Sequence, residues 1–316
     1  VSQSGRPEAA RESLRRGLAL AEKLLAEGDE DLLLARAKFA RCISELGDHP
    51  AARDLYAWLV RDRRRHSPER LDRIAYMVGN LALEEEWLGD IPRSRELFEE
   101  AHALMLEAHG SRDHLAVVHM SLLLSNVLRE VGDLTTAQAM QERALAKYRE
   151  VFPAFHPNVL WAQGFLGVTQ RDLGEYEAAH ASFLKALRVA RTVLPEDHFG
   201  IQIGRLHLAI TKRLMGDLDG AQQVFEQVVA SLEKSGRPDR MELVWARGNL
   251  ADVVKARGDL AAARDHLGRA IEEIERSLPD DHYGLAEARR AQAFVLAGLE
   301  DAEGLRAMLG DIARAG

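Results

Sequence analysis

The sequence predicts an all-α protein built from stacked helical hairpins. A Gly followed by an acidic residue recurs six times at intervals of 42 or 43 residues, at Gly47, Gly89, Gly132, Gly174, Gly216 and Gly258. A small residue stands five positions after each Gly, and a bulky one usually stands nine positions after it, with Gln141 the exception. No segment alternates apolar and polar residues as a half-buried strand would.

Each period is a hairpin because the Gly suits the left-handed conformation that ends a helix. The pattern predicts a lone helix at about residues 7–27 and then seven hairpins, whose first helices begin near residues 31, 68, 113, 157, 199, 239 and 283. Pro50 and Pro92 follow a Gly closely, where a second helix begins. His156, His198 and His282 recur in the linkers between hairpins, where Asp or His can cap the next helix.

We expect residues 1–316 to form a single array. Residues 1–29 would be the second helix of an incomplete hairpin, residues 30–282 the repeats, and residues 283–316 a degenerate cap, since Glu300 stands where the Gly is expected. Two interpretations of the opening helix remain: a terminal helix with its own packing, or a chain cut from a longer protein.

The positions that hold a small residue, or usually a bulky one, in each period resemble those of the tetratricopeptide repeat. The 42-residue period, the His-containing linkers and the segments Gly79-Asn80-Leu81-Ala82 and Gly248-Asn249-Leu250-Ala251 resemble the kinesin light chain type. The resemblance implies a right-handed α-solenoid whose first helices line a concave groove. Residues 36–38 of the first hairpin and the linker at 236–240 depart from the pattern.

Composition excludes several classes of protein. A net charge of −8 argues against a nucleic-acid binder, which would need a basic surface for phosphates. The single Cys42 excludes an intrachain disulfide and a multi-cysteine metal site. No apolar run reaches the length of about 18 residues that crosses a bilayer. We therefore expect a cytoplasmic protein, and the excess of Arg over Lys favours a bacterial source.

No catalytic motif is present: the phosphate-binding, zinc-protease and nucleophile-elbow patterns are all missing. The twelve His are scattered or belong to the linkers. We therefore expect no enzyme activity, no metal and no cofactor.

The resemblance implies that residues 13, 10, 9, 6, 3 and 2 positions before each Gly face the groove. Position −3 is the most informative column, because four consecutive hairpins place a cation there. The candidate groove residues from these columns are Tyr76, Asn80, His119, Asn126, Arg129, Trp161, Phe165, Arg171, His207, Arg213, Trp245, Asn249 and Lys255.

A basic rail beside an aromatic floor would suit an extended peptide with acidic and aromatic residues. The Asn amides would bond the backbone of that peptide. Two alternatives remain open. The cations would instead favour the helix dipole and pair locally with Glu130 or Asp172, and the aromatic side chains would instead pack into the core.

Two charge runs lie outside these columns. Residues 61–65 are rich in Arg and end a second helix, where a solvated end or an acidic partner would suit them. Glu84, Glu85 and Glu86 lie on the next first helix and could pair with that run locally or in a self-contact.

The leading functional hypothesis is a non-catalytic scaffold that binds a peptide or protein segment, as the recognition part of a larger regulatory protein. A second hypothesis is a sensor whose superhelix changes pitch when it binds a peptide or small molecule. A third is a self-assembly module, in which the chain forms a homo-oligomer.

Overall fold

The computed structural model describes residues 7–26, 28–235, 241–277 and 283–301, with Gly304 and Arg306. These residues contain helices and turns and no strand, so the predicted all-α class is confirmed. The chain divides into two compact units, Val1–Phe152 and Pro153–Gly316. Each unit is described by itself.

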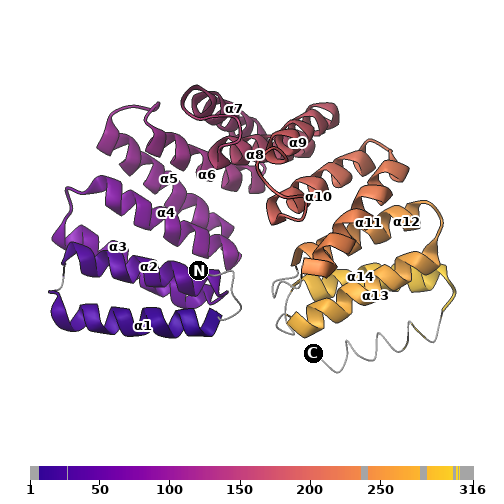
Figure 1. Ribbon diagram of the computed structural model, residues 1–316, viewed down its shortest axis with the longest axis horizontal. Helices are drawn as coiled ribbons and strands as arrows, with labels where there is room; N and C mark the ends of the chain where they lie inside the picture. The colour runs from indigo at the N-terminus through magenta and orange to yellow at the C-terminus, as the bar shows by residue number, and fades with distance from the viewer. Residues whose placement is uncertain are drawn as a thin grey trace. The chain divides into compact units, whose positions relative to one another are not determined.

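The first unit stacks its helices in chain order (Figure 1). They are α1 (Pro7–Leu24), α2 (Glu30–Glu45), α3 (His49–His66), α4 (Leu71–Trp87), α5 (Ile91–His109), α6 (Leu115–Glu130) and α7 (Leu134–Val151). The lone helix α1 lies against α2, where Arg36 donates to Glu22 and stacks on Trp58 of α3. This contact explains why residues 36–38 depart from the repeat pattern.

The second unit continues the same order with α8 (Pro157–Asp172), α9 (Tyr176–Ala190), α10 (Phe199–Leu214), α11 (Leu218–Ser235), α12 (Met241–Ala256), α13 (Leu260–Ser277) and α14 (Tyr283–Gly298). The first helix α10 also contacts the first helices α8 and α12 directly. All seven first helices begin within three residues of their predicted starts. Of the second helix expected in the last hairpin, only Gly304 and Arg306 are among the described residues.

The repeating Gly ends each first helix as predicted. Gly47, Gly89, Gly132, Gly174, Gly216 and Gly258 have φ between 80° and 89°, and Glu300 takes the same place with φ 55°. The predicted His caps are confirmed at two linkers, where Nδ1 of His156 and of His198 accepts from the backbone N–H two residues later. His282 lies outside the described residues.

The small and bulky columns form the core of the hairpins. The side chains of Ala52, Ser94, Ala137, Ala179, Ala221 and Ala263 are fully buried. A close approach also occurs at Gly167, where a Cβ would lie 2.8 Å from Cε1 of Phe183. The backbone of α8 therefore needs Gly at this position to contact α9.

Gln141 is the exception in the bulky column, and it is fully buried in α7. Among the residues that the structure describes, its Nε2 and Oε1 have no hydrogen-bond partner, whereas equivalent positions hold Phe, Tyr or Leu. We expect Gln141→Leu to raise the free energy of unfolding by about 1–3 kcal/mol, because it removes an unsatisfied polar group. Thermal unfolding followed by circular dichroism would show a melting temperature higher by several degrees.

The matched control is Gln227→Leu on the exposed side of α11, which should leave the melting temperature nearly unchanged. A lower melting temperature for Gln141→Leu would mean that the buried amide is satisfied by an ordered water and is needed.

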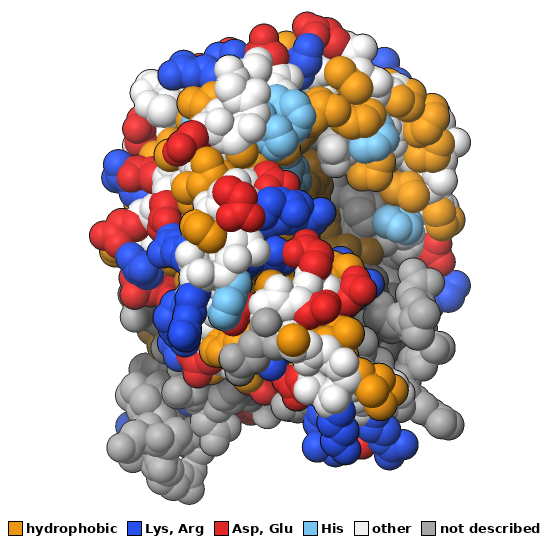
Figure 2. All heavy atoms as spheres, turned by 90° about the vertical axis from the view of Figure 1, so that its left-hand side faces the viewer, with side chains coloured by type: hydrophobic (Ala, Val, Ile, Leu, Met, Phe, Trp, Pro, Cys, Tyr) orange, Lys and Arg blue, Asp and Glu red, His pale blue; other side chains and the backbone are white. Residues whose placement is uncertain are grey.

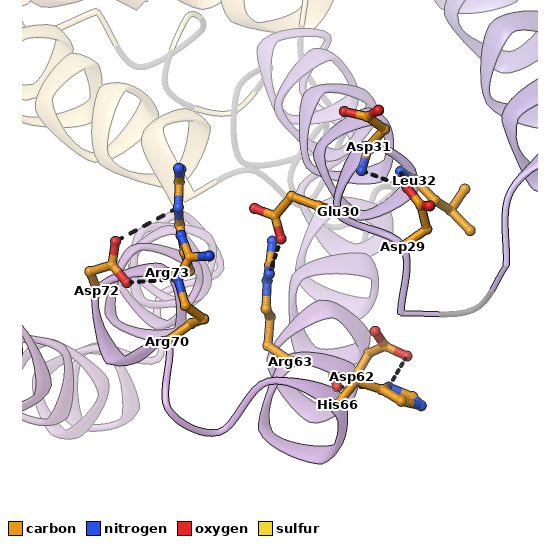
Figure 3. Close-up of polar contacts among 10 residues, drawn as sticks. All are labelled: Asp29, Glu30, Asp31, Leu32, Asp62, Arg63, His66, Arg70, Asp72 and Arg73. Carbon is orange, nitrogen blue, oxygen red and sulfur yellow. Dashed lines mark hydrogen bonds and ion pairs between the residues drawn. The ribbon is translucent and has the colours of Figure 1, made fainter.

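Part of the Arg run at the end of α3 pairs with acidic side chains inside the fold (Figure 3). Arg63 is only 2% exposed and donates through Nη1 to Glu30 at the start of α2. Asp62 pairs with His66 at 3.3 Å, and Arg64 pairs with Glu100 of α5. The acidic residues 84–86 of α4 do not pair with the Arg run of α3. Glu84 binds His49 instead, and Glu86 accepts a hydrogen bond from Asn126. The expectation of local pairing between the two runs was therefore wrong.

Candidate functional site

The second unit presents two half-exposed tryptophans on its first helices. Trp161 of α8 is 54% exposed and Trp245 of α12 is 52% exposed. Since a core residue would be covered, both side chains belong to the surface. They occupy the same position of the repeat, thirteen residues before the Gly, as the sequence columns place them.

Other aromatic rings join these tryptophans. Phe165 stacks on Trp161 with ring centroids 5.8 Å apart. His207 of α10 stacks on Phe183 of α9 at 5.4 Å and meets the edge of Trp245 at 6.4 Å. His207 is thus the ring that connects α9, α10 and α12. We call Trp161, Phe165, His207 and Trp245 the aromatic surface of the second unit.

The cations three positions before each Gly are not all free charges. The guanidinium of Arg171 lies 3.4 Å from Asp172 and donates to Nδ1 of His207 at 3.3 Å, and its side chain is only 14% exposed. Nδ1 of His207 accepts this bond, since an Arg nitrogen can only donate. Lys255 pairs with Asp252 at 3.2 Å. The alternative of local pairing therefore describes Arg171 and Lys255 in part.

Arg213 of α10 stands apart from the other cations of the column. It makes no ion pair with any residue in the described part of the chain, and its Nε is buried without a hydrogen-bond partner. Its helix places it three residues after Ile210, on the same face of α10. Among the cations of this column, Arg213 is thus the one that makes no ion pair with a described residue.

The first unit places the remaining candidates on α4 and α6. Tyr76 is 51% exposed, and Asn80 donates back to the carbonyl oxygen of Tyr76 at 2.7 Å. Asn249 in the second unit repeats this bond to the carbonyl oxygen of Trp245 at 2.9 Å. Each amide therefore keeps one N–H and its oxygen for another partner.

Three candidates of α6 are engaged within the unit. His119 shares a hydrogen bond of 3.3 Å with the hydroxyl of Tyr148, and burial lowers the pKa of His119. Asn126 donates to Glu86 at 3.2 Å and accepts from Arg129, which lies 3.2 Å from Glu130. The local pair of Arg129 with Glu130 is thus present, and Asn126 already uses one N–H and its oxygen within the unit.

The list of candidate groove residues omits Trp87, an exposed aromatic residue of a first helix. Trp87 ends α4 and is 71% exposed, more than Trp161 or Trp245. It stands two residues before Gly89, a position that the family geometry already turns toward the groove. The signal was therefore present in the sequence.

On the face drawn in Figure 2, acidic and basic side chains are interspersed, in keeping with the many local ion pairs. No helix in the described ranges is long and apolar enough to cross a bilayer. The same ranges contain no group of three or more His, Cys, Asp or Glu side chains placed to hold a metal ion.

Residues 118–192 and 202–276 match the family described as the tetratricopeptide repeat. These segments are tetratricopeptide repeats. No curated protein sequence matches the chain. The tetratricopeptide fold is also seen in solved structures. A Rap protein complexed with competence and sporulation factor has a TM-score of 0.66 and 14% identity, covering 96% of this chain and 91% of that one.

Two further structures share the fold. NprR in complex with its cognate peptide NprX has a TM-score of 0.66 and 15% identity, covering 97% of this chain and 85% of that one. The kinesin light chain-like repeats of Podosopora anserina have a TM-score of 0.55 and 18% identity, covering 64% of this chain and 96% of the other. The similarity to Rap and NprR and to the kinesin light chain-like repeats confirms the tetratricopeptide fold that the sequence predicts.

Proposed function

We propose that the chain is a non-catalytic tetratricopeptide scaffold that binds an extended peptide or protein segment on its first helices. The aromatic surface of the second unit takes an aromatic side chain of the partner, and Arg213 takes an acidic one. The protein acts in the cytoplasm, as the recognition part of a larger regulatory protein.

The exposure of Trp161 and Trp245 carries this proposal. A tryptophan that is half exposed on a first helix leaves apolar area in contact with water, which is unfavourable for an isolated monomer. Tryptophans are also enriched among the side chains that dominate binding energy. Stacking on Phe165 and contact with His207 hold the two indoles, so that less conformational entropy is lost on binding.

Arg213 supplies the charge preference. Arg213 is partly exposed and makes no ion pair with a described residue, so its guanidinium can take an acceptor from a partner. A carboxylate of the partner is such an acceptor and can bind a guanidinium with two hydrogen bonds. Arg171 and Lys255 add positive potential at the same position of the neighbouring repeats, although local carboxylates already hold them. Binding of a peptide by NprR, a protein with the same fold, also supports a peptide as partner.

The test is selection from a displayed library of random peptides, followed by affinity measurement for the enriched sequences. We expect enrichment of Asp or Glu close to Phe, Tyr or Trp. Arg213→Glu should weaken binding of the selected peptides by at least about tenfold, because it places like charges together. Trp161→Ala and Trp245→Ala should each weaken it by a comparable factor.

Arg188→Glu on the second helix α9 is the matched control, since Arg188 is exposed and makes no ion pair with a described residue. Circular dichroism should show the same helicity for all variants. Full binding by Arg213→Glu and by both Trp variants would contradict the proposal and move the search to the second helices.

A further inference from the structure

The first unit carries an aromatic line of its own on α4. Tyr76, Asn80, Leu83 and Trp87 follow one another at spacings of four, three and four residues, which puts them on one face of the helix. The line spans about 16 Å at the rise of an α-helix. Its two aromatic ends, Tyr76 and Trp87, are 51% and 71% exposed.

Trp87 is held in place on one side only. Its indole stacks on the ring of His49 with centroids 5.0 Å apart and an angle of 8° between the planes. Nδ1 of His49 lies 2.9 Å from Oε2 of Glu84, whose side chain is buried. The buried carboxylate thus orients the imidazole, and the imidazole orients the indole. The remaining face of Trp87 is left open to a partner.

The charge beside this line is negative. Glu86 directly precedes Trp87 and points toward α6, where its carboxylate accepts from the neutral amide of Asn126 at 3.2 Å. It forms no ion pair with a residue that the structure describes, while Arg129 is bound to Glu130. Burial and the neighbouring Glu130 raise the pKa of Glu86 to about 7. Arg129 offsets this rise only in part, so Glu86 is a carboxylate that no described cation pairs with directly.

We propose that the α4 line of the first unit is a docking surface for a basic peptide segment of a partner protein, with an Arg or Lys side chain at Glu86 and an apolar side chain on Trp87. A cation placed there is attracted by the Glu86 carboxylate and by the electron-rich open face of the Trp87 indole. Preorganisation by His49 reduces the entropy lost on docking.

This surface is distinct in charge from the aromatic surface of the second unit. There the unpaired side chain is Arg213, and here it is Glu86. An acidic segment would be repelled by Glu86 and Glu130 and would find no free cation beside Trp87. The inference depends on the first unit alone. Basic peptides can therefore fail to bind the first unit while acidic peptides bind the second unit, and acidic peptides can fail to bind the second unit while basic peptides bind the first.

The test uses the full chain labelled with 5-fluorotryptophan, whose four fluorine resonances report Trp58, Trp87, Trp161 and Trp245 separately. Substitution of each Trp by Phe assigns them. The probes are two acetylated, amidated hexapeptides that alternate Leu with either Arg or Glu. At pH 8 we expect the basic peptide to shift the Trp87 resonance in a saturable way, and the acidic peptide to leave it in place.

Glu86→Gln should raise the dissociation constant of the basic peptide about fivefold, the loss expected for one ion pair. This variant keeps the shape of the side chain, so a lost affinity would not reflect misfolding. The matched control is Glu107→Gln, an exposed carboxylate on α5 that makes no ion pair with a described residue, which should change nothing.

Three results would overturn the proposal. In the first, the Trp87 resonance would stay in place with the basic peptide at millimolar concentration. In the second, the Trp87 resonance would move equally with the acidic peptide. In the third, the unliganded chain sediments as an oligomer that Trp87→Phe or Glu86→Gln converts to a monomer, so that a second copy covers this surface.

Discussion

Glu30→Gln should lower the free energy of unfolding by about 3 kcal/mol, because it leaves Arg63 as a buried charge without its partner. Arg63 is 2% exposed, whereas the side chain of Glu30 is 51% exposed. Arg63→Met should therefore cost far less, since the carboxylate that remains is solvated and the new side chain is apolar. Urea denaturation of both single variants and of the double variant would measure this asymmetry.

The double variant should be close to Arg63→Met in stability, since the two changes act on one interaction. The pH dependence gives a second readout. The Arg63 guanidinium lowers the pKa of Glu30 below 4.5, so the pair stabilises the fold above that value. Its contribution should disappear as the pH falls through the lowered pKa. Equal costs for Glu30→Gln and Arg63→Met would show that Arg63 is not a desolvated charge.

Glu86→Gln should have the opposite effect and stabilise the protein in a pH-dependent way. Burial and Glu130 raise the pKa of Glu86 from 4.5 to about 7 in the folded state. The folded state then holds a proton that the unfolded state releases, so wild-type stability falls as the pH rises from 4.5 through 7. Because Gln carries no charge, the variant should lack this fall.

We expect Glu86→Gln to be more stable than wild type by about 2 kcal/mol at pH 8, and nearly equal to it at pH 4. Urea midpoints at several pH values would measure the difference. Glu107→Gln is again the control, with parallel curves for variant and wild type. If the curves of Glu86→Gln and wild type also ran parallel, Arg129 and Asn126 would fully compensate the buried charge.

The repeat made most of the fold predictable from the sequence. A Gly at one place in each period fixes where a helix ends, because it is the residue that takes a positive φ without strain. The starts of α2, α4 and α6 followed from the same count and differ from the prediction by at most three residues. The single break in the bulky column, Gln141, was visible before its burial was known.

The candidate site was less predictable, because pairing depends on side chains that approach across helices. The columns place Arg171 and Arg213 identically, yet Arg171 meets Asp172 and His207 while Arg213 has no ion pair among the described residues. The column alone does not distinguish them, because the difference lies in their neighbours. Asp172 follows Arg171 whereas Leu214 follows Arg213, and His207 of the following repeat also meets Arg171. Whether these residues bind a peptide stays a prediction.

The constant period has a consequence for the history of the chain. In each unit a helix contacts its neighbours in the sequence and, at α10, the first helices on either side. Gly174 and Gly216 lie exactly one period of 42 residues apart, so unequal recombination between these repeats would join Gly174 to Asp217 and keep the register of every hairpin. The array can thus gain or lose a whole layer in one genetic event. Arg213 and His207 would leave in such a loss, while Trp161 and Trp245 would remain.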